Sequence, residues 1–164
     1  MRDDALTGEY PVKFDGARFL VPATPRRVVI DRWQGEVIAF PWESYIVLFS
    51  GLASHPVKTA MAAVYPSDLP DNFDPLKATG SERLMVRSIA SKLISDTLDR
   101  KGRLVVPRSM LAAVGISDEA ILVGVIDHLE LWAPSAWQSP DEVSIERLAE
   151  KLEYLVSQFQ GAQS

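Results

Sequence analysis

Short apolar runs separated by polar turns recur along the chain, and this pattern predicts a β-rich fold. ILVGVIDHLELW, residues 121–132, has two apolar runs around a tight turn near Asp127, so it predicts a hairpin. In its second run Leu129 and Leu131 fall on one face and Glu130 on the other, because side chains alternate along a strand. Such alternation is typical of a strand with one buried face.

Other segments predict further strands. VIAF, residues 37–40, and YIVLF, residues 45–49, lie on either side of the turn-like sequence PWES, which predicts a second hairpin. Residues 95–98 lead into a glycine-containing turn at 99–103, and the apolar residues 104–106 then run into a proline. We therefore expect a strand, a turn and a strand here.

Helical signals are fewer. RSMLAAVGI, residues 108–116, predicts a short helix that stops at Gly115. Residues 65–75 are rich in Pro and Asp and predict a loop. SERLMVRSIASKLIS, residues 81–95, predicts an amphipathic helix with an apolar stripe formed by Met85, Ile89 and Leu93.

The last segment carries the most complete set of helix signals. Ser139 can cap a helix, Pro140 suits its first position, Glu142 completes a capping box and Gly161 can end it. Apolar residues then recur at alternating steps of three and four, as in a heptad seam: Ile145, Leu148, Leu152, Leu155 and Phe159. Two interpretations stay open, because the seam can pack against its own domain or contact another subunit.

The chain contains a degenerate internal duplication. FDGARFLVP, residues 14–22, shares an Asp, a Gly, an Arg and a Pro with the stretch at 99–107. Three landmark pairs keep one order at offsets of 84, 85 and 83 residues: Asp15 with Asp99, Arg18 with Arg103, and Leu48 with Leu131. We predict two half-repeats that form one structural domain, residues 1–80 with the linker and 81–138, followed by a C-terminal helix and tail at 139–164.

Composition narrows the class of protein. The chain has 164 residues, 47% of them hydrophobic and 24% charged, which is typical of an ordinary globular protein. It has no cysteine, so disulfides, Cys-ligated zinc and cysteine nucleophiles are excluded. The N-terminal sequence lacks the features of a signal peptide, and no apolar run is long enough to span a bilayer. We expect a cytoplasmic protein without membrane contact.

The net charge of the chain is negative, whereas one short segment is strongly basic. The formal net charge of −5 argues against a protein that coats nucleic acid through bulk positive charge. Yet LDRKGRLVVPRSM, residues 98–110, concentrates four cations around one glycine: Arg100, Lys101, Arg103 and Arg108. A local basic patch is compatible with an acidic chain if assembly repeats the patch by symmetry.

Catalytic and metal-binding signals are weak. Asp68, Asp71 and Asp74 recur at every third residue but lack the alternating ligands and closing Glu of a calcium loop. His55 beside a proline and His128 in a hairpin turn are expected to be surface histidines, and neither has an evident catalytic partner in the sequence. Phosphate-binding glycine loops are absent, and the four tryptophans are expected to be core residues. We therefore expect no enzyme activity, cofactor, metal or small-molecule substrate.

The basic turn resembles a known motif. LDRKGRLVVP, residues 98–107, is similar to the D-x-K-G-R motif of the MraZ family, bacterial transcriptional regulators within the AbrB-like swapped-hairpin superfamily. Residues 115–137 are similar to the family's continuation, with two strands and two tryptophans in matching positions. The resemblance implies a β-rich α/β fold, a double swapped-hairpin barrel built from two degenerate half-repeats with a C-terminal helix. It also implies a homo-oligomeric ring.

The resemblance implies a function as well. The family's motif loops are DNA-contacting elements, so the chain is expected to bind double-stranded DNA at repeated short boxes upstream of a division and cell-wall operon, in the nucleoid. The implied DNA-binding residues are Arg18, Arg26, Arg100, Lys101, Arg103 and Arg108, with Asp15, Asp99 and Gly102 as structural turn residues.

The first motif departs from the family pattern. Its Lys-Gly pair is replaced by Gly16 and Ala17, and one residue is lost before Arg18. Arg26 and Arg27 are expected to restore positive charge near this turn. The eroded motif favours an alternative, an oligomeric interaction module that kept the fold and lost DNA binding.

Overall fold

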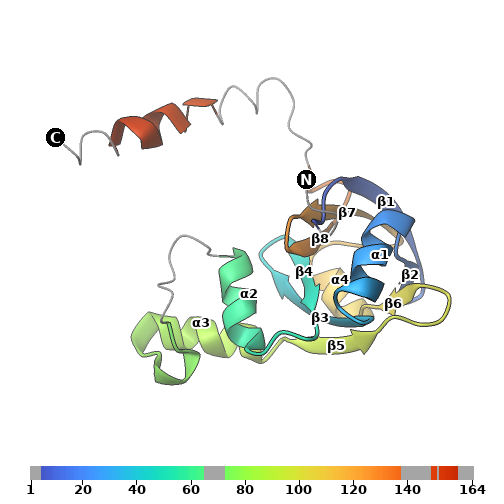
Figure 1. Ribbon diagram of the computed structural model, residues 1–164, viewed down its shortest axis with the longest axis horizontal. Helices are drawn as coiled ribbons and strands as arrows, with labels where there is room; N and C mark the ends of the chain where they lie inside the picture. The colour runs from blue at the N-terminus through green and yellow to red at the C-terminus, as the bar shows by residue number, and fades with distance from the viewer. Residues whose placement is uncertain (1–4, 65–72, 138–148, 151, 159–164) are drawn as a thin grey trace.

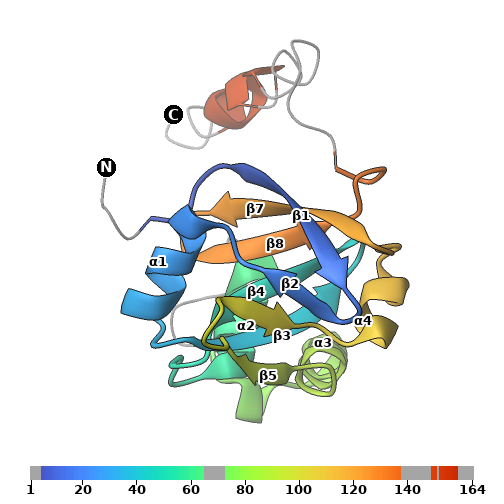
Figure 2. The ribbon, with the colours of Figure 1, turned by 90° about the vertical axis from the view of Figure 1, so that its right-hand side faces the viewer.

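A single antiparallel sheet curls into a nearly closed barrel in the computed structural model, which describes residues 5–64, 73–137, 149–150 and 152–158 (Figures 1 and 2). Within these residues the sheet has eight strands in the order β5-β3-β4-β8-β7-β1-β2-β6. The strands are β1 (Glu9–Asp15), β2 (Arg18–Leu20), β3 (Glu36–Trp42), β4 (Tyr45–Ser50), β5 (Ile94–Thr97), β6 (Arg103–Val105), β7 (Glu119–Val125) and β8 (His128–Trp132). The helices are α1 (Ala23–Asp31), α2 (Pro56–Val64), the short 3₁₀ helix η1 (Pro75–Lys77), α3 (Gly80–Ala90) and α4 (Arg108–Ala113).

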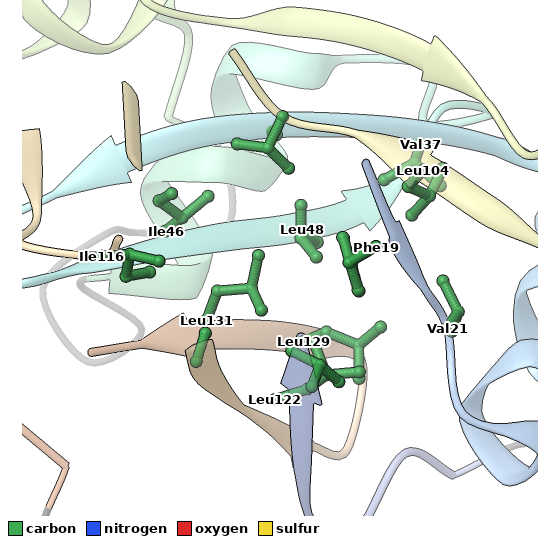
Figure 3. Close-up of a cluster of buried hydrophobic side chains, with 14 of the residues drawn as sticks. Phe19, Val21, Val37, Ile46, Leu48, Leu104, Ile116, Leu122, Leu129 and Leu131 are labelled. Carbon is green, nitrogen blue, oxygen red and sulfur yellow. The ribbon is translucent and has the colours of Figure 1, made fainter. Parts of the chain in front are cut away.

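Alternation along the strands builds the core inside the barrel. In β8 Leu129 and Leu131 are buried while Glu130 between them is half-buried on the outer face, as the sequence predicts. Figure 3 shows how apolar side chains from strands far apart in sequence meet in this interior. The labelled members are Phe19, Val21, Val37, Ile46, Leu48, Leu104, Ile116, Leu122, Leu129 and Leu131.

The duplication in the sequence is also present in the fold. The succession β1-β2-α1-β3-β4 recurs as β5-β6-α4-β7-β8. The two halves interlock, because β1 of the first half pairs with β7 of the second and β3 of the first pairs with β5 of the second. The other cross-half pairs join equivalent strands, β2 with β6 and β4 with β8. This arrangement confirms the predicted double swapped-hairpin barrel.

A pseudo-twofold axis relates the two halves. In the β2–β6 pair, Phe19 lies opposite its own equivalent, Leu104, and in the β4–β8 pair, Val47 lies opposite its own equivalent, Glu130. These pairs lie four strands apart in either direction around the barrel. The axis therefore passes through the two strand pairs on opposite sides of the barrel.

The symmetry breaks where the barrel nearly closes. β1 pairs with β2 in the first half, whereas the described ladders pair β5 only with β3 and β6 only with β2. Across this gap a carboxylate oxygen of Asp96 on β5 accepts a hydrogen bond from the backbone N–H of Val105 on β6, at 2.8 Å. The side chain thus satisfies a backbone donor that a closed ladder would otherwise pair.

Two helices cover the outer face of the β3–β4 hairpin and form a second apolar cluster with it. α2 and α3 bring Met61 and Ile89 against outward-facing residues of β3 and β4 such as Phe40, Val47 and Phe49. Figure 1 shows this helical layer on one side of the barrel. The described residues of the second half have no comparable helical layer.

Several helix predictions need correction. The helix predicted over 81–95 ends at Ala90, because Ile94 and Ser95 join β5 and pair with β3. α1 and α2 have no clear signal in the sequence. α1 contains Pro25, Val28 and Val29, which are poor helix formers. These three residues are buried, and their burial stabilises the helix. The short helix at 108–116 is confirmed as α4, and Gly115 follows it with a left-handed φ of 76°.

The predicted C-terminal helix is present where the chain is described. Residues 149–150 and 152–158 are helical, and all of their described side chains are exposed. The predicted cap at Ser139, Pro140 and Glu142, the stop at Gly161 and the seam residues Ile145, Leu148 and Phe159 lie outside the described residues. Leu152 and Leu155 of the seam do not pack against the barrel.

The linker region carries no calcium loop in its described part. Asp68 and Asp71 lie outside the described residues, and Asp74 instead caps η1 by accepting a hydrogen bond from the Leu76 N–H at 3.0 Å. None of the described helices is both long enough and apolar enough to cross a bilayer.

Candidate nucleic-acid interface

The β2–β6 pair places the two motif arginines on one outward face. Arg18 on β2 lies opposite Val105, and Arg103 on β6 lies opposite Leu20. Phe19, between Arg18 and Leu20, points into the core (Figure 3). Because side chains alternate, Arg18, Leu20, Arg103 and Val105 point outwards. The two arginines are therefore diagonal neighbours about the pseudo-twofold axis, one from each half-repeat.

Asp99 organises the second turn. One of its carboxylate oxygens accepts hydrogen bonds from the backbone N–H groups of Lys101, at 2.9 Å, and Arg103, at 2.8 Å. The other oxygen accepts from the Arg103 side-chain Nε at 2.8 Å. Gly102 has a φ of 84°, a conformation that glycine adopts at little cost. The turn thus fixes both the backbone and the side chain of Arg103.

Hydrogen bonding keeps Asp99 ionised. The backbone N–H of Arg103 makes the largest contribution, and the Arg103 side chain and the Lys101 N–H add to it, so that the pKa of Asp99 falls below its ordinary value of 3.8. Partial desolvation opposes this shift but does not outweigh it. At neutral pH the carboxylate is available to orient the arginine.

Replacing Asp99 separates its two roles. Asp99→Asn keeps an oxygen that can accept the backbone N–H bonds but weakens the attraction to the Arg103 guanidinium, whereas Asp99→Ala removes both. If Arg103 contacts DNA, we expect Asp99→Asn to lower affinity by roughly fivefold and Asp99→Ala by more than about tenfold. Fluorescence anisotropy with a labelled duplex measures this. Equal affinity of all three proteins would contradict an orienting role for Asp99.

The first turn is built differently. Asp15 and Arg18 are directly paired across a two-residue turn in which Gly16 has a φ of 62°. Among the described residues, Arg18 makes no ion pair that corresponds to the one between Asp99 and Arg103. The lost residue therefore leaves Arg18 exposed but without a carboxylate that orients it.

Arg26 belongs to the second turn rather than the first. The Val21 N–H donates to the Gly102 carbonyl at 3.0 Å, which brings the start of α1 to this turn. A Cβ atom placed on Gly102 would lie 2.7 Å from Cδ and from a guanidinium nitrogen of Arg26. The expectation that Arg26 supplements the first turn is therefore corrected, because the start of α1 in the first half lies against the turn of the second half.

Arg108 has the complementary position. The Val106 N–H donates to the Ala17 carbonyl at 2.8 Å, so the start of α4 lies beside the first turn. The Arg108 guanidinium donates to the Ser117 carbonyl and lies 3.4 Å from a carboxylate oxygen of Asp118. The structure therefore groups Arg26 with Arg100, Lys101 and Arg103 at the second turn, and Arg108 with Arg18 at the first.

The expectation of a surface position for His128 is wrong. Its side chain is 7% exposed on the outer face of β8, between two carboxylates. Nδ1 lies 2.8 Å from an Asp127 oxygen and Nε2 lies 3.0 Å from a Glu130 oxygen, while the Trp132 indole N–H donates to Glu130 at 3.0 Å. His55 is exposed, as expected. No group of residues suited to hold a metal occurs in the described part of the chain.

His128 gives the fold a pH dependence. Burial is the largest influence and lowers its pKa, but the hydrogen bonds and charges of Glu130 and Asp127 together outweigh it and raise the pKa above 6.5. Protonated His128 therefore stabilises the folded state. This stabilisation is complete below the pKa that His128 has in the unfolded chain, and it is lost as the pH rises through the higher pKa that His128 has in the folded protein. We expect the melting temperature of the wild type, relative to His128→Gln, to fall as the pH rises from about 6.5, the ordinary pKa of histidine, through the raised pKa of the folded state. A constant difference across this range would contradict charge pairing of His128.

The fold and the turns together define the class of protein. A barrel of two interlocked half-repeats with basic turns at the shared β2–β6 pair is an AbrB-like swapped-hairpin protein. A family model described as "MraZ protein, putative antitoxin-like" matches residues 94–156, which contain strands β5 to β8 of the second half-repeat. This part of the chain is thus similar to the MraZ family, as the motif at residues 98–107 indicates.

Individual relatives agree with this assignment. A protein named "Transcriptional regulator MraZ" from Roseiflexus sp. strain RS-1 is 39% identical over 62 residues, which are 37% of this chain and 43% of that protein. The protein of the same name from Desulforapulum autotrophicum is 36% identical over 53 residues, 32% of this chain and 36% of the relative. These matches thus span less than half the length of either relative.

A longer match extends into the first half-repeat. The "Transcriptional regulator MraZ" of Alcanivorax borkumensis is 23% identical over 141 residues, which cover 83% of this chain and 88% of that protein. The short matches thus have higher sequence identity than the long one. The family model covers the strands that carry the complete motif at residues 98–107.

Proposed function

We propose that the chain is a sequence-specific DNA-binding transcriptional regulator. It binds repeated short boxes upstream of a division and cell-wall operon, through the basic turns of a ring oligomer, and acts in the cytoplasm at the nucleoid. The proposal rests mainly on the β2–β6 pair, which presents Arg18 and Arg103 on one outward face. The names of the matched relatives, transcriptional regulators rather than enzymes, support the same conclusion.

The two kinds of cation would have different roles. Arg103 and Arg18 read guanine O6 and N7 in the major groove, because the guanidinium fork can make two parallel hydrogen bonds there. Arg100 and Lys101, which are exposed on the second turn, contact phosphates and set the register. Arg26 and Arg108 lie behind the turns and support the positive potential.

Assembly resolves the conflict with net charge. A chain with a formal net charge of −5 attracts DNA weakly as a whole. Several subunits that present the same face to successive boxes gain avidity, because the second contact is made at a high effective concentration.

Binding selectivity tests the proposal. We would measure the anisotropy of a labelled duplex from upstream of the protein's own gene, against a scrambled duplex, over a salt series. We expect preference for the upstream duplex and an affinity that falls steeply with salt. Failure to bind either duplex at low salt would overturn the proposal.

An interaction module without DNA binding is the second candidate. It is favoured by the first turn, where Asp15 does not orient Arg18 as Asp99 orients Arg103, and by the exposed apolar side chains of the C-terminal helix. An oligomer that ignores DNA at low salt would support it.

A further inference from the structure

We propose that the C-terminal helix of one copy docks in a hollow beside α3 of the next copy and so forms the contact between subunits. The hollow has an apolar floor and an arginine rim, and the helix carries exposed leucines beside a glutamate. This inference names the surfaces that build the ring of the proposed function, and it rests on that function for its purpose.

The hollow lies between η1 and α3. It is open, has a volume of about 250 Å³ and is lined by Pro75, Leu76, Arg83, Val86 and Arg87. Leu76 is 88% exposed, and Leu84 on the outer surface of α3 is also exposed. An apolar surface of this kind on a helical insertion is typical of an interaction site.

The rim is positively charged. Within the described residues, neither Arg83 nor Arg87 has a carboxylate within ion-pair distance. The Arg83 side chain donates a long hydrogen bond of 3.5 Å to the Ala78 carbonyl, which holds it beside the hollow. The site therefore favours an occupant that combines apolar side chains with acidic ones.

The C-terminal helix has that combination. Leu152 and Leu155 are both 61% exposed, and Val156 beside them is also exposed. Their spacing of three and four residues places them on one helix face. Glu153 flanks this face and, like the two arginines, has no ion-pair partner among the described residues.

The C-terminal helix follows β8 as α2 follows β4, but the outer face of the β7–β8 hairpin is already covered by Trp137. In the first half, the helix after β4 packs on the outer face of the hairpin, where Val47 is buried. In the second half Glu130 takes the place of Val47. Trp137 packs against Trp132 with ring centroids 5.6 Å apart and donates a hydrogen bond to Glu9. A helix cannot cover this face as α2 covers the first without displacing Trp137.

A contact between two different surfaces of the same chain has a defined outcome. Each copy offers one hollow and one helix, so the contact is heterologous and can repeat from copy to copy until it closes into a ring. Burial of the leucines supplies affinity, and pairing of Glu153 with the arginines fixes orientation.

Complementary variants of the full chain test this arrangement. The hollow variant is Arg83→Glu with Arg87→Glu, and the helix variant is Leu152→Ser with Leu155→Ser. All four positions are exposed, and circular dichroism checks that each variant folds. Light scattering after size-exclusion chromatography, without DNA, gives the masses, with Leu52→Ser as an exposed control.

We expect the wild type and the control to form a large assembly and each double variant to have the mass of one chain, 18.1 kDa. An equimolar mixture of the two variants should form a dimer and nothing larger, because only one intact hollow and one intact helix remain per pair. Adding Glu153→Lys to the hollow variant should restore the assembly by exchanging the charges, whereas Glu150→Lys, on the opposite side of the helix, should not.

Three results would overturn the inference. A monomeric wild type means that the helix does not join copies. A hollow variant that still assembles, when the helix variant does not, means that helices pair with one another. Assembly of both variants means that the contact lies elsewhere. Because these masses are measured without DNA, they are independent of the binding experiment that tests the proposed function.

Discussion

The double variant Arg18→Ala, Arg103→Ala should bind the upstream duplex no better than a scrambled one. The two arginines share the outward face of the β2–β6 pair, so they reach the same stretch of DNA. Each base-reading arginine is expected to contribute roughly 1 to 3 kcal/mol, which is about five- to 150-fold in affinity. The loss from the double variant should be the larger, although the two sites are close enough for their effects to be non-additive.

Single variants separate base reading from phosphate contact. We expect Arg103→Ala to relax selectivity, while Arg100→Ala should weaken both duplexes about equally and reduce the salt slope by about 1. Lys92→Ala, at an exposed position after α3, is the matched control and should change nothing. Retained preference for the upstream duplex in the double variant would show that other residues read the sequence.

The second large effect concerns stability. Phe19→Ala should lower the free energy of unfolding by about 3 to 5 kcal/mol, as do other buried Phe-to-Ala changes. Phe19 is 1% exposed, lies opposite Leu104 on the pseudo-twofold axis, and its ring packs 5.0 Å from that of Phe14. Its removal leaves a cavity beneath the strand pair that carries the two arginines.

The neighbouring residue provides the control for this prediction. Leu20 is 53% exposed on the same strand, so Leu20→Ala should change stability by less than about 0.5 kcal/mol. Denaturant unfolding of the three proteins, followed by tryptophan fluorescence, measures the difference. Similar midpoints for Phe19→Ala and the wild type would mean that the two halves do not depend on this contact.

Local patterns predicted the strands well, because their signal is contained in a few residues. The alternation around Leu129 and Leu131 and the turn of Asp99 to Arg103 both have the expected structure. The duplication was also visible, since offsets of 83 to 85 residues are preserved in the elements. The ends of helices were harder to predict. Ile94 belongs to a strand because it pairs with Ala39 of β3, which lies 55 residues earlier in the chain.

The candidate site was predictable as a set of residue types but not as an arrangement. Which turn each arginine supports depends on the exchange between half-repeats, so the position of Arg26 against Gly102 has no local signature. His128 has a partial signal, because alternation places His128 and Glu130 on one face with Asp127 beside them. Its burial, however, depends on neighbouring strands and could not be inferred from the hairpin alone.

Tethered cleavage measures most directly whether the β2–β6 face lies against DNA. The chain has no cysteine, so Leu20→Cys introduces a single site between the two arginines for an iron chelate that cuts nearby DNA. Ser44→Cys puts the same reagent at the β3–β4 turn, next to the strand pair on the other side of the barrel. We expect cuts at regular positions within the upstream boxes from Leu20→Cys and none above background from Ser44→Cys. Equal cutting from both positions, or cutting only from Ser44→Cys, would contradict DNA binding through this face.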